Sequence, residues 1–439
     1  MIPVPSDLKK FAFLFPVPLY LVGGYVRDAL SGRISDDYDI CSSLPAEKVA
    51  SLLSGTPYVI SLIKKDTGTV AIACHGTEWQ YTAFRTDRYE GGHTPAATYP
   101  TDIEGDARRR DFKANAVYYD IKNDKIVDPL GGVKDIENRI LSTTRSPKEV
   151  FSEDGLRLMR LARQAAETGF SVHPDTLAGA RENAEKIDEI APERIRVELE
   201  RILLAPVPSV GLKLLHEEGV LARILPELDV ACGLPQRKDY HRYDVFGHIL
   251  STVDAADKSI VTAALFHDIG KPVCYLKNGN YHGHDEVGAE LCKEVMRRLR
   301  YCNKEIEETV RLVRRHMFDL AGNARENTVR LFVQKNADVL DKLCFLMDAD
   351  MIGCGYVKSG RSPVSLRLIA TYEEMKREKV PFSVKDLLVR GNDIPEDVLP
   401  VSERTKALNG LLAACAQKGS PLTTKEKQLQ YIIHNSKGR

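Results

Sequence analysis

Apolar residues follow two different patterns along the chain, and the change between them divides it into two regions. Up to about residue 140 they form short stretches rich in β-branched and aromatic residues, as is typical of strands. These stretches are Tyr20–Val22, Tyr38–Ile40, Val70–Cys74, Tyr81–Phe84 and Ala116–Tyr119. After Asp128–Gly132, apolar residues recur at helical spacing almost to the end of the chain. The pattern predicts an α+β protein with a small mixed sheet in an N-terminal head, followed by an all-α region.

With 439 residues the chain exceeds one ordinary domain, so several are expected. We predict a head over residues 1–140, a helical neck over 141–205, a helical body over 206–355 and a helical tail over 356–439. Between Arg85 and Asp106 the sequence is rich in Gly, Pro and Thr, which predicts a mobile loop. The apolar run Phe11–Val22 contains prolines and leads into two glycines, so we interpret it as a buried helix and strand and not as a secretion signal.

Charge and cysteine usage narrow the class of protein. Lys plus Arg and Asp plus Glu both total 62, so the net charge is zero. Nucleic-acid-binding proteins are more often basic, which weighs against an RNA substrate unless basic residues gather locally. The nine cysteines form no C-x-x-C pair, which indicates reduced thiols and a cytoplasmic protein. No stretch of the sequence is long and apolar enough to predict a membrane span.

Gly23 and Gly24 lie between an apolar strand and a helix that we expect to begin near Tyr25. Glycines let the backbone approach a phosphate closely, and amide groups at a helix start point towards an anion. Arg27, one turn into the helix, adds a cation to the same place. The alternative for this pair taken alone is an ordinary turn between a strand and a helix.

Asp37 and Asp39 are two residues apart on an expected strand, so both carboxylates would leave one face while Asp36 faces the other way. Mg²⁺ binds few protein carboxylates and completes its shell with phosphate oxygens and water. Two carboxylates at a strand edge therefore predict a metal site for attack on phosphorus. A solvated turn is the alternative, because the same D-x-D spacing recurs at Asp348–Asp350.

Arg110 and Asp111 belong to a charged run that leads into an apolar segment. A guanidinium group suits a triphosphate, and a carboxylate accepts a hydrogen bond from a ribose hydroxyl. We therefore predict that both residues contact a nucleotide. A surface charge run is the alternative interpretation.

Asp154, Arg157 and Arg160 lie along one ridge if the segment Glu153–Arg163 is a helix, and Arg163 extends the ridge. Cytosine and adenine each present an amino donor beside a ring-nitrogen acceptor, whereas guanine and uracil present the reverse. A fixed carboxylate beside a fixed arginine would accept C and A and reject G and U. A salt-bridged, solvated helix face is the alternative.

In this order, the motifs resemble those of the class II tRNA nucleotidyltransferases, which are the CCA-adding enzymes, and of the related bacterial poly(A) polymerases. The matching segments are Leu21–Asp28, Asp37–Asp39, Thr82–Arg85, Arg109–Asp111, Asp128–Asp135, Glu153–Arg157 and Glu193–Ile195. The resemblance implies a polymerase-β-like nucleotidyltransferase head. It also implies CTP, ATP and tRNA as partners, and Mg²⁺ as the cofactor.

Residue by residue, the resemblance assigns Mg²⁺ to Asp37 and Asp39 and the nucleotide to a second group of residues. In that group Gly24 and Arg27 meet the triphosphate, Arg110 contacts the nucleotide, Asp154 and Arg157 template the base, and Arg160 and Arg163 line the same pocket. The family often has a Glu on the strand before T-x-F-R, where this chain has Gln80. A third metal carboxylate is therefore not identified, and Glu78 is only a weak candidate for it.

A second set of residues lies in the helical body, where Ala263–Pro272 resembles the signature of the HD metal-dependent phosphohydrolases. Adjacent His267 and Asp268 offer an imidazole and a carboxylate, which are ligands for Mn²⁺, Fe, Ni²⁺ or Mg²⁺. By this resemblance His248 and Asp350 are the outer ligands, and His284 and His316 match the extra histidines of two-metal members. An HD fold with weak metal occupancy is the alternative.

The sequence thus predicts an enzyme that adds C, C and A to the 3′ end of tRNA, with a possible phosphohydrolase activity in the HD domain. Rival interpretations are a poly(A) polymerase, an enzyme that adds only CC or only A, and an HD phosphohydrolase with a vestigial head. The segment Phe382–Ile394 resembles the C-terminal part of CCA-adding enzymes that carry an HD domain. We therefore expect the tail to contact tRNA. The sequence makes no prediction about the number of subunits.

Overall fold

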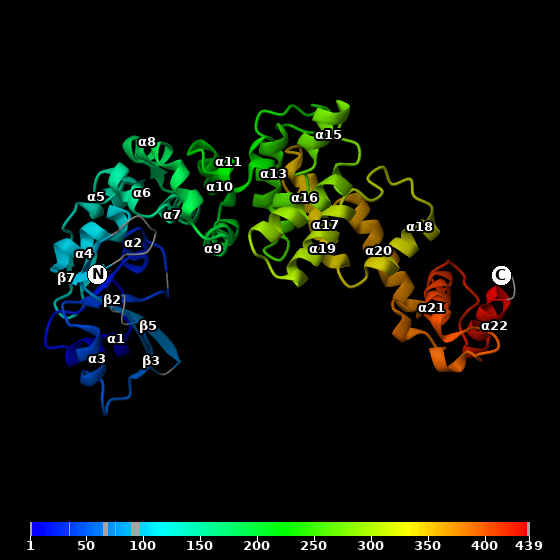
Figure 1. Ribbon diagram of the computed structural model, residues 1–439, viewed down its shortest axis with the longest axis horizontal. Coiled ribbons are helices and arrows are strands. Elements are labelled where there is room, and N and C mark those ends of the chain that lie inside the picture. Colours follow the sequence, from blue (N-terminus) through cyan, green and yellow to red (C-terminus); the bar gives the residue numbers. More distant parts are fainter. Residues whose placement is uncertain (1, 35, 65–68, 75, 89–96, 437–439) are drawn as a thin grey trace. The chain divides into compact units, whose positions relative to one another are not determined.

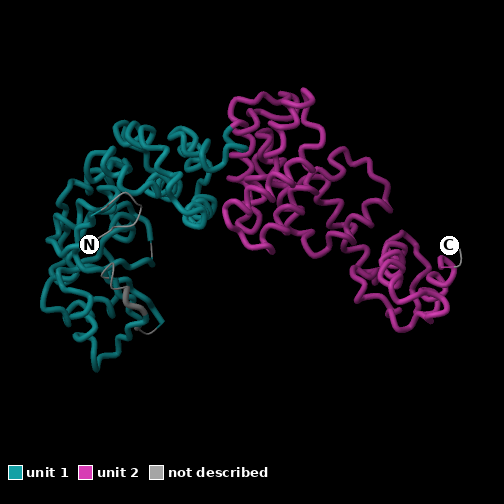
Figure 2. The backbone as a smooth tube through the Cα atoms, viewed as in Figure 1, with its two compact units in different colours: residues 1–229 teal, residues 230–439 magenta. Residues whose placement is uncertain are grey.

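A computed structural model describes residues 2–34, 36–64, 69–74, 76–88 and 97–436 of the chain. The chain forms two compact units, residues 1–229 and residues 230–439 (Figure 2). Within the described parts, none of the helices combines the length and apolar character that crossing a bilayer needs. The thiols of Cys41, Cys232, Cys274, Cys292, Cys302, Cys344, Cys354 and Cys415 are free.

A seven-stranded mixed sheet forms the centre of the head, with the order β3-β4-β5-β2-β1-β8-β9. Its strands are β1 (Tyr20–Val22), β2 (Asp39–Ser42), β3 (Val59–Lys64), β4 (Thr69–Cys74), β5 (Thr77–Ala83), β8 (Tyr118–Asp120) and β9 (Lys125–Val127). Strands β2 and β5 run parallel, and the other neighbours run antiparallel. The predicted mixed sheet in an N-terminal head is confirmed.

The apolar run near the N-terminus forms helix α1 (Ser6–Leu14) and strand β1, as the sequence predicts. Phe11 is fully buried and packs against Trp79 of β5, with 5.2 Å between ring centroids, and against Phe15 at 5.1 Å. Edge-to-face and tilted aromatic pairs of this kind stabilise a core beyond their buried area. This aromatic cluster fixes α1 against the sheet.

The segment after β5 differs from the mobile loop that the sequence predicts. Residues 85–88 and 97–100 pair as an antiparallel hairpin of β6 (Arg85–Arg88) and β7 (Ala97–Pro100). Helix α4 (Ile103–Arg109) follows, and the side chain of Asp102 caps it by accepting from the Gly105 amide. Residues 89–96, the centre of the predicted loop, lie outside the described residues.

The first unit also contains helices, both within the head and after it (Figure 1). They are α2 (Gly24–Leu30) and α3 (Ala46–Leu52) within the head, then α5 (Gly132–Asn138), α6 (Pro147–Glu153), α7 (Leu156–Thr168), α8 (Pro174–Glu182), α9 (Pro192–Leu203), α10 (Pro208–Glu217), α11 (Leu221–Ile224) and α12 (Pro226–Asp229). Short 3-10 helices span Lys113–Asn115 and Ala184–Glu189. Prolines begin several of these helices because the first turn needs no amide donor.

The described residues of the second unit form helices and connecting segments, with no strand. Its helices are α13 (Val245–Ala255), α14 (Val261–Phe266), α15 (Lys271–Asn278), α16 (His284–Arg298), α17 (Asn303–Arg315), α18 (Glu326–Asn336), α19 (Leu340–Gly353), α20 (Pro363–Arg377), α21 (Val401–Cys415) and α22 (Lys425–Ser436). Short 3-10 helices at Val384–Asp386 and Gly391–Asp393 precede α21. The tail has a core of its own, in which Leu411 of α21 and Ile432 of α22 are buried together.

Candidate functional site

The glycine turn lies where the chain leaves strand β1 and enters α2. Gly23 has a φ of 81°, a conformation that favours glycine. A Cβ on Gly23 would lie 3.2 Å from Oδ2 of Asp39, tighter than an ordinary contact. Strands β1 and β2 pair with Val22 opposite Asp39, which brings the turn and the acidic residue to one edge of the sheet. The glycine therefore keeps the space beside this carboxylate open.

The two aspartates lie at the start of β2, although only one of them is in the strand. Asp39 is the first strand residue and is half-buried, whereas Asp37 precedes the strand and is exposed. Burial and the charge of Asp37 raise the pKa of Asp39 from 3.8 to about 6, and Arg110 and Arg160 offset only part of this rise. A carboxylate whose pKa is raised by burial and a like charge is stabilised in its ionised form by a nearby cation.

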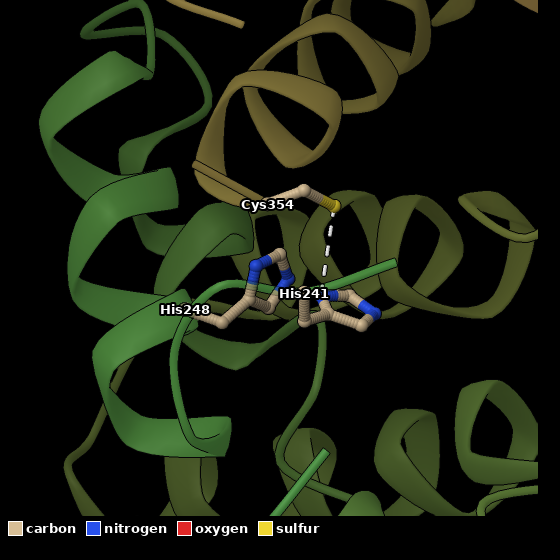
Figure 3. A group of neighbouring side chains, drawn as sticks. All are labelled: His241, His248 and Cys354. Atoms are coloured by element: carbon tan, nitrogen blue, oxygen red, sulfur yellow. Dashed lines mark hydrogen bonds between the residues drawn. The ribbon is translucent and has the colours of Figure 1, made fainter. Parts of the chain in front are cut away.

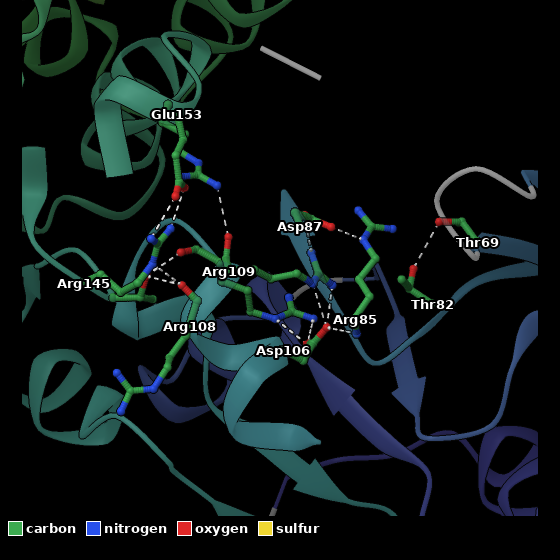
Figure 4. Close-up of polar contacts among 12 residues, drawn as sticks. Thr69, Thr82, Arg85, Asp87, Asp106, Arg108, Arg109, Arg145 and Glu153 are labelled. Atoms are coloured by element: carbon green, nitrogen blue, oxygen red, sulfur yellow. Dashed lines mark hydrogen bonds and ion pairs between the residues drawn. The ribbon is translucent and has the colours of Figure 1, made fainter. Parts of the chain in front are cut away.

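Asp106, which was not singled out from the sequence, accepts hydrogen bonds from two neighbouring arginines and so orients them; Figure 4 shows it with Arg109. It is fully buried on α4, and its oxygens accept from Arg109 Nε at 2.8 Å and from Arg110 Nε at 3.2 Å. The hydroxyl of Tyr118 donates to the same carboxylate at 2.8 Å. Asp106 precedes Arg109 by three residues and Arg110 by four. On a helix this spacing places the side chains next to one another, so the sequence did contain an indication of the role of Asp106.

Arg27 is buried and held by polar groups from other elements. Its Nη1 donates to Asn115 Oδ1 at 2.9 Å and to Gln164 Oε1 at 3.2 Å, and its Nε donates to Asp28 at 2.9 Å. Asn115 and Gln164 were not predicted, because they lie 88 and 137 residues away in the sequence. These bonds fix the guanidinium at the edge of the pocket next to Gly24.

Asp111 is buried, and both of its oxygens accept hydrogen bonds from within the protein. Oδ1 accepts from the Phe112 amide at 2.8 Å and from Asn115 at 3.1 Å, and Oδ2 accepts from Arg160 Nε at 2.7 Å. Burial acts to raise the pKa of Asp111, but Arg160 and Asn115 hold it well below its usual range. Asp111 therefore holds Arg160 in place as a charged partner.

The predicted continuous ridge from Asp154 to Arg163 is interrupted. Helix α6 ends at Glu153, Asp154 is extended with φ −149°, and α7 begins at Leu156. A Cβ on Gly155 would lie 2.1 Å from the Lys186 carbonyl oxygen, so the helix start can pack here only with glycine. Just before α7, Asp154 Oδ1 accepts a hydrogen bond from the Leu156 amide at 3.0 Å. The break turns the Asp154 carboxylate towards the pocket instead of along α7.

The arginines of α7 are fixed by partners on other elements. Arg157 Nη1 donates to the Val150 carbonyl at 2.8 Å and to Glu153 at 2.9 Å, and its Nη2 donates to the Arg109 carbonyl at 3.1 Å. Arg163 Nε lies 3.3 Å from Glu198 of α9, and burial lowers the pKa of Arg163. Such pre-set guanidinium groups lose little freedom when a ligand binds.

All of these predicted residues of the head and neck line one cavity of about 940 Å³. Its lining includes Gly23, Gly24, Arg27, Asp37, Asp39, Arg110, Asp111, Asp154, Arg157, Arg160 and Arg163. Gln80 lies there too, opposite Asp39 in the parallel β2–β5 pair. Arginines outnumber carboxylates in this lining, so the zero net charge of the chain conceals a basic cavity that suits a polyphosphate.

The predicted histidines and aspartates of the second unit also come together. His248 Nε2 lies 3.0 Å from both His267 Nε2 and Asp350 Oδ1. Asp268 Oδ1 lies 3.1 Å from His284 Nε2 and 3.9 Å from His316 Nε2. They form two adjoining groups, each able to hold one ion: His248, His267 and Asp350, and Asp268, His284 and His316.

Three of these histidines are oriented by the backbone. Nδ1 of His267, His284 and His316 each lies 2.6–2.8 Å from the carbonyl three residues earlier. If Nδ1 carries the proton, Nε2 presents its lone pair to the centre, as a metal ligand must. The Nε2 atoms of His284 and His316 are buried without a hydrogen-bond partner. This donor set fits a divalent metal better than it fits a structural polar cluster.

The charges of this centre are strongly coupled. Burial disfavours the charged form of His267, but Asp268 and Asp350 raise its pKa to about 10. Burial together with His267 and His284 lowers the pKa of His316 to about 4. Lys271 Nζ lies 2.5 Å from Asp268 and was not singled out from the sequence. Its place one turn beyond the His-Asp pair was the available signal.

Three protein families match successive parts of the chain. Residues 19–142 match the "Poly A polymerase head domain", and residues 169–232 match the "Probable RNA and SrmB- binding site of polymerase A". Residues 241–343 match the "HD domain". The first match contains the Gly23 turn and both Asp37 and Asp39, and the third contains five of the six predicted metal ligands of the second unit, all but Asp350.

Known proteins match over most of the chain. An A-adding tRNA nucleotidyltransferase of Deinococcus radiodurans is 32% identical over 356 residues, which cover 76% of this chain and 76% of the relative. A multifunctional CCA protein of Xanthomonas campestris pv. campestris is 32% identical over 316 residues, 68% of this chain and 75% of the relative.

The fold is also that of a solved enzyme. The CCA-adding enzyme of Bacillus stearothermophilus, solved in complex with CTP, superposes with a TM-score of 0.70 over 99% of both chains, at 22% identity. At this identity the comparison concerns the fold. The identity and coverage of the curated relatives, together with the polymerase head and the HD domain, show that the chain belongs to the tRNA nucleotidyltransferase family, which includes the CCA-adding enzymes.

Proposed function

We propose that this protein adds C, C and A to the 3′ end of tRNA from CTP and ATP, without a nucleic-acid template. The observation that carries the proposal is one cavity of the first unit. It combines a carboxylate pair, fixed arginines and a base-edge acceptor. The activities for which the relatives are named support the same function. The tRNA 3′ hydroxyl attacks the α-phosphorus of the nucleotide, and pyrophosphate leaves.

Asp37 and Asp39 fit a Mg²⁺ site, because their mutual repulsion and the burial of Asp39 are relieved by a cation. When bound, the metal lowers the pKa of the attacking hydroxyl and neutralises phosphate charge. Gln80, which faces Asp39 across the β2–β5 pair, carries no charge and offers one amide oxygen. We therefore assign the charged ligands to the two aspartates alone.

The arginines that face this carboxylate pair bind the triphosphate. Asp106 sets Arg110, and Asp111 sets Arg160, so both groups are oriented before the nucleotide arrives. Preorganised donors of this type stabilise the charge that develops on the leaving pyrophosphate. The Gly23–Gly24 backbone approaches the phosphates from the side of β1. We assign Arg27 to the same phosphates from the edge of the cavity.

The lengths of the reaction products distinguish complete CCA addition from the rival activities. The Deinococcus relative bears the name of an A-adding enzyme, whereas the Xanthomonas relative bears the name of a multifunctional CCA protein. tRNA that lacks its 3′ end is incubated with CTP, with ATP and with both, and the product lengths are resolved. CC with CTP alone and CCA with both nucleotides are expected. Addition of A only to tRNA ending in CC would identify an A-adding enzyme, and a long A tail would identify a poly(A) polymerase.

Mg²⁺ binding at the aspartates is expected to depend on pH in a predictable direction. In the folded protein the pKa of Asp39 is about 6, against a usual value of 3.8. Mg²⁺ requires the ionised carboxylate, so stabilisation by Mg²⁺ is present above pH 6 and lost as the pH falls through 6. We expect saturating Mg²⁺ to raise the Tm of the first unit by about 5 °C at about pH 7.5 and far less at about pH 5.

The matched control for this measurement is Asp39→Asn, which removes the charge and keeps the size. Because the HD centre also binds divalent ions, the relevant quantity is the difference in Tm shift between the wild-type protein and this variant. An equal Mg²⁺ shift in both proteins at both pH values would contradict the assignment of Asp39 as a ligand.

We further propose that the HD centre hydrolyses phosphoesters with a divalent metal. The two adjoining ligand groups carry this second function, since a pair of metals can hold both the attacking and the leaving oxygen. The chemistry that the metals supply is activation of water. Lys271, which is buried against Asp268, adds a fixed cation beside the centre. We propose that the bound ion is Mn²⁺, Fe, Ni²⁺ or Mg²⁺, because imidazole and carboxylate ligands bind these metals.

The double variant His267→Ala/Asp268→Ala is expected to lose hydrolysis of bis(p-nitrophenyl) phosphate with Mn²⁺ or Ni²⁺, and to keep CCA addition. The reason is that the two sites lie in different compact units. The reciprocal control is Asp39→Ala, which should hydrolyse the ester at the wild-type rate. Because Asp268 is buried, Asp268→Asn tests the same ligand with little change in packing. Loss of nucleotide addition in a folded double variant would show that the sites are not independent.

The partners of the proposed reactions are tRNA, CTP and ATP. We assign the protein to the cytoplasm, where thiols remain reduced, and the free cysteines of the described residues agree with this assignment. We also propose that the tail, residues 356–439, contacts the tRNA.

A further inference from the structure

A third group of possible metal ligands lies beside the HD centre. It consists of His241, His248 and Cys354 (Figure 3). One ring nitrogen of each histidine and the Cys354 sulfur all lie within 4.8 Å of one another. His248 belongs to this group and to the HD group with His267 and Asp350. Neither the HD signature nor the family matches assign a role to His241 or Cys354.

The backbone holds the two new residues together. His241 precedes α13, and Cys354 directly follows α19. The amide of Arg242 donates to the Cys354 carbonyl at 2.9 Å, which ties the two segments side by side. Gly355 has a φ of 84°, and a Cβ there would lie 2.7 Å from the ring of Tyr243. Only glycine therefore allows this close approach, so the positions of His241 and Cys354 are set by the fold.

The spacing fits a coordinated ion. His241 Nδ1 lies 3.5 Å from Cys354 Sγ. Two ligands of a tetrahedral Zn²⁺, a nitrogen at about 2.05 Å and a sulfur at about 2.3 Å, would lie about 3.6 Å apart. The ring centroids of His241 and His248 are 4.6 Å apart, and Figure 3 shows both rings close to the Cys354 side chain. The ligand atoms therefore need little movement to surround one ion.

The group is also chemically distinct from the HD centre beside it. The HD ligands are nitrogen and oxygen atoms, which accept Mg²⁺, Mn²⁺ and Fe. Cys354 adds a thiolate, which selects Zn²⁺, Cd²⁺ and Co²⁺ from the same pool of ions. His241 and Cys354 are both partly exposed, whereas His248 is fully buried. An ion therefore reaches the group from its exposed side.

We propose that His241, His248 and Cys354 form an accessory site for a thiophilic divalent ion such as Zn²⁺. On binding, the Cys354 sulfur forms a bond to the metal and its proton passes to solvent. The site shares His248 with the HD group. The proposal concerns metal binding and does not depend on what the HD centre hydrolyses.

The test uses Co²⁺ as a spectroscopic substitute for Zn²⁺ in the full-length protein. Co²⁺ is expected to give a thiolate-to-cobalt charge-transfer band in the near ultraviolet, and Zn²⁺ should abolish the band. Cys354→Ser, which keeps the size and a hydrogen bond to His241, should lose the band and weaken Zn²⁺ binding by about 10-fold or more. Cys232→Ser changes an exposed cysteine of the same unit outside the group and should leave both unchanged.

A second variant separates a built site from a single reactive thiol. His241→Ala should weaken Zn²⁺ binding as Cys354→Ser does, because it removes a ligand. Thermal unfolding of the metal-free proteins shows that the variants are folded. A Co²⁺ spectrum without a thiolate band, or a band that survives Cys354→Ser, would overturn the proposal and leave the 3.5 Å contact as a simple hydrogen bond.

Discussion

Asp39→Ala is expected to reduce nucleotide addition to tRNA by about 1,000-fold or more, and Asp37→Ala should do the same. A bound metal ion stabilises the charge that develops around phosphorus in the transition state, which lowers the barrier by several kcal/mol. Each 1.4 kcal/mol corresponds to about tenfold in rate. Neighbouring acidic residues do not replace these ligands, because Asp111 is already bonded to Arg160, and Asp106, which does not line the cavity, is bonded to Arg109 and Arg110. Initial rates with CTP and tRNA lacking its 3′ end provide the measurement.

The fold should survive this change. Burial and the neighbouring Asp37 already raise the pKa of Asp39, so its ionised form does not stabilise the folded protein at neutral pH. The matched control is Asp36→Ala, which removes an exposed carboxylate that does not line the cavity. Near-normal incorporation by Asp39→Ala in a folded protein would remove the polymerase assignment.

Features that depend on local sequence were predictable. The short apolar stretches around Tyr20–Val22 and Val70–Cys74 form strands, because alternation and β-branched residues act over a few neighbouring positions. The glycine turn and the aspartates lie close together because β1 and β2 are adjacent in the sheet. The His267–Asp268 pair marks the HD centre for a similar reason, since the pair occurs at a helix end.

Features that depend on long-range contacts were not predictable in the same way. Asn115 and Gln164 hold Arg27 from distant parts of the chain, and no periodicity links them. The break at Asp154 arises because Gly155 packs against the Lys186 carbonyl, a contact across more than one element that overrides the helical pattern. The hairpin of β6 and β7 replaced a predicted loop because cross-strand pairing satisfies the backbone of a segment rich in turn-forming residues.

This break at Asp154 matters for base selection. A carboxylate on the continuing helix would follow the direction of α7, whereas the extended residue places its Oδ1 on the Leu156 amide. Oδ2 lies 4.0 Å from Arg194 of α9, so the carboxylate lies between the two helices at the cavity wall. Two backbone carbonyl oxygens and the Glu153 carboxylate hold Arg157 beside Asp154. Both groups are therefore fixed before a base arrives, which a rigid protein template requires.

Asp154→Asn is expected to lower the use of CTP and ATP by about 10-fold or more and to relax the rejection of UTP and GTP. The carboxylate accepts the amino proton of C or A, while Arg157 donates to the adjacent ring nitrogen. Asparagine keeps the size and can still accept the hydrogen bond from the Leu156 amide, but it adds an NH₂ donor, which suits the carbonyl oxygen of U or G. A hydrogen bond to a charged group contributes about 1.5–3 kcal/mol, which sets this magnitude. Single-nucleotide incorporation with each of the four nucleotides is the measurement.

The controls distinguish base reading from a change in the fold. Asp175→Asn, at an exposed position on α8 outside the cavity, should leave all four rates unchanged. Arg157→Ala should lower the two correct activities together, because the donor to the ring nitrogen serves both C and A. Full preference for C and A in Asp154→Asn would rule out the protein template. Selection would then come from the tRNA end or from another side chain, and Arg194, which faces the same carboxylate, would be the first to examine.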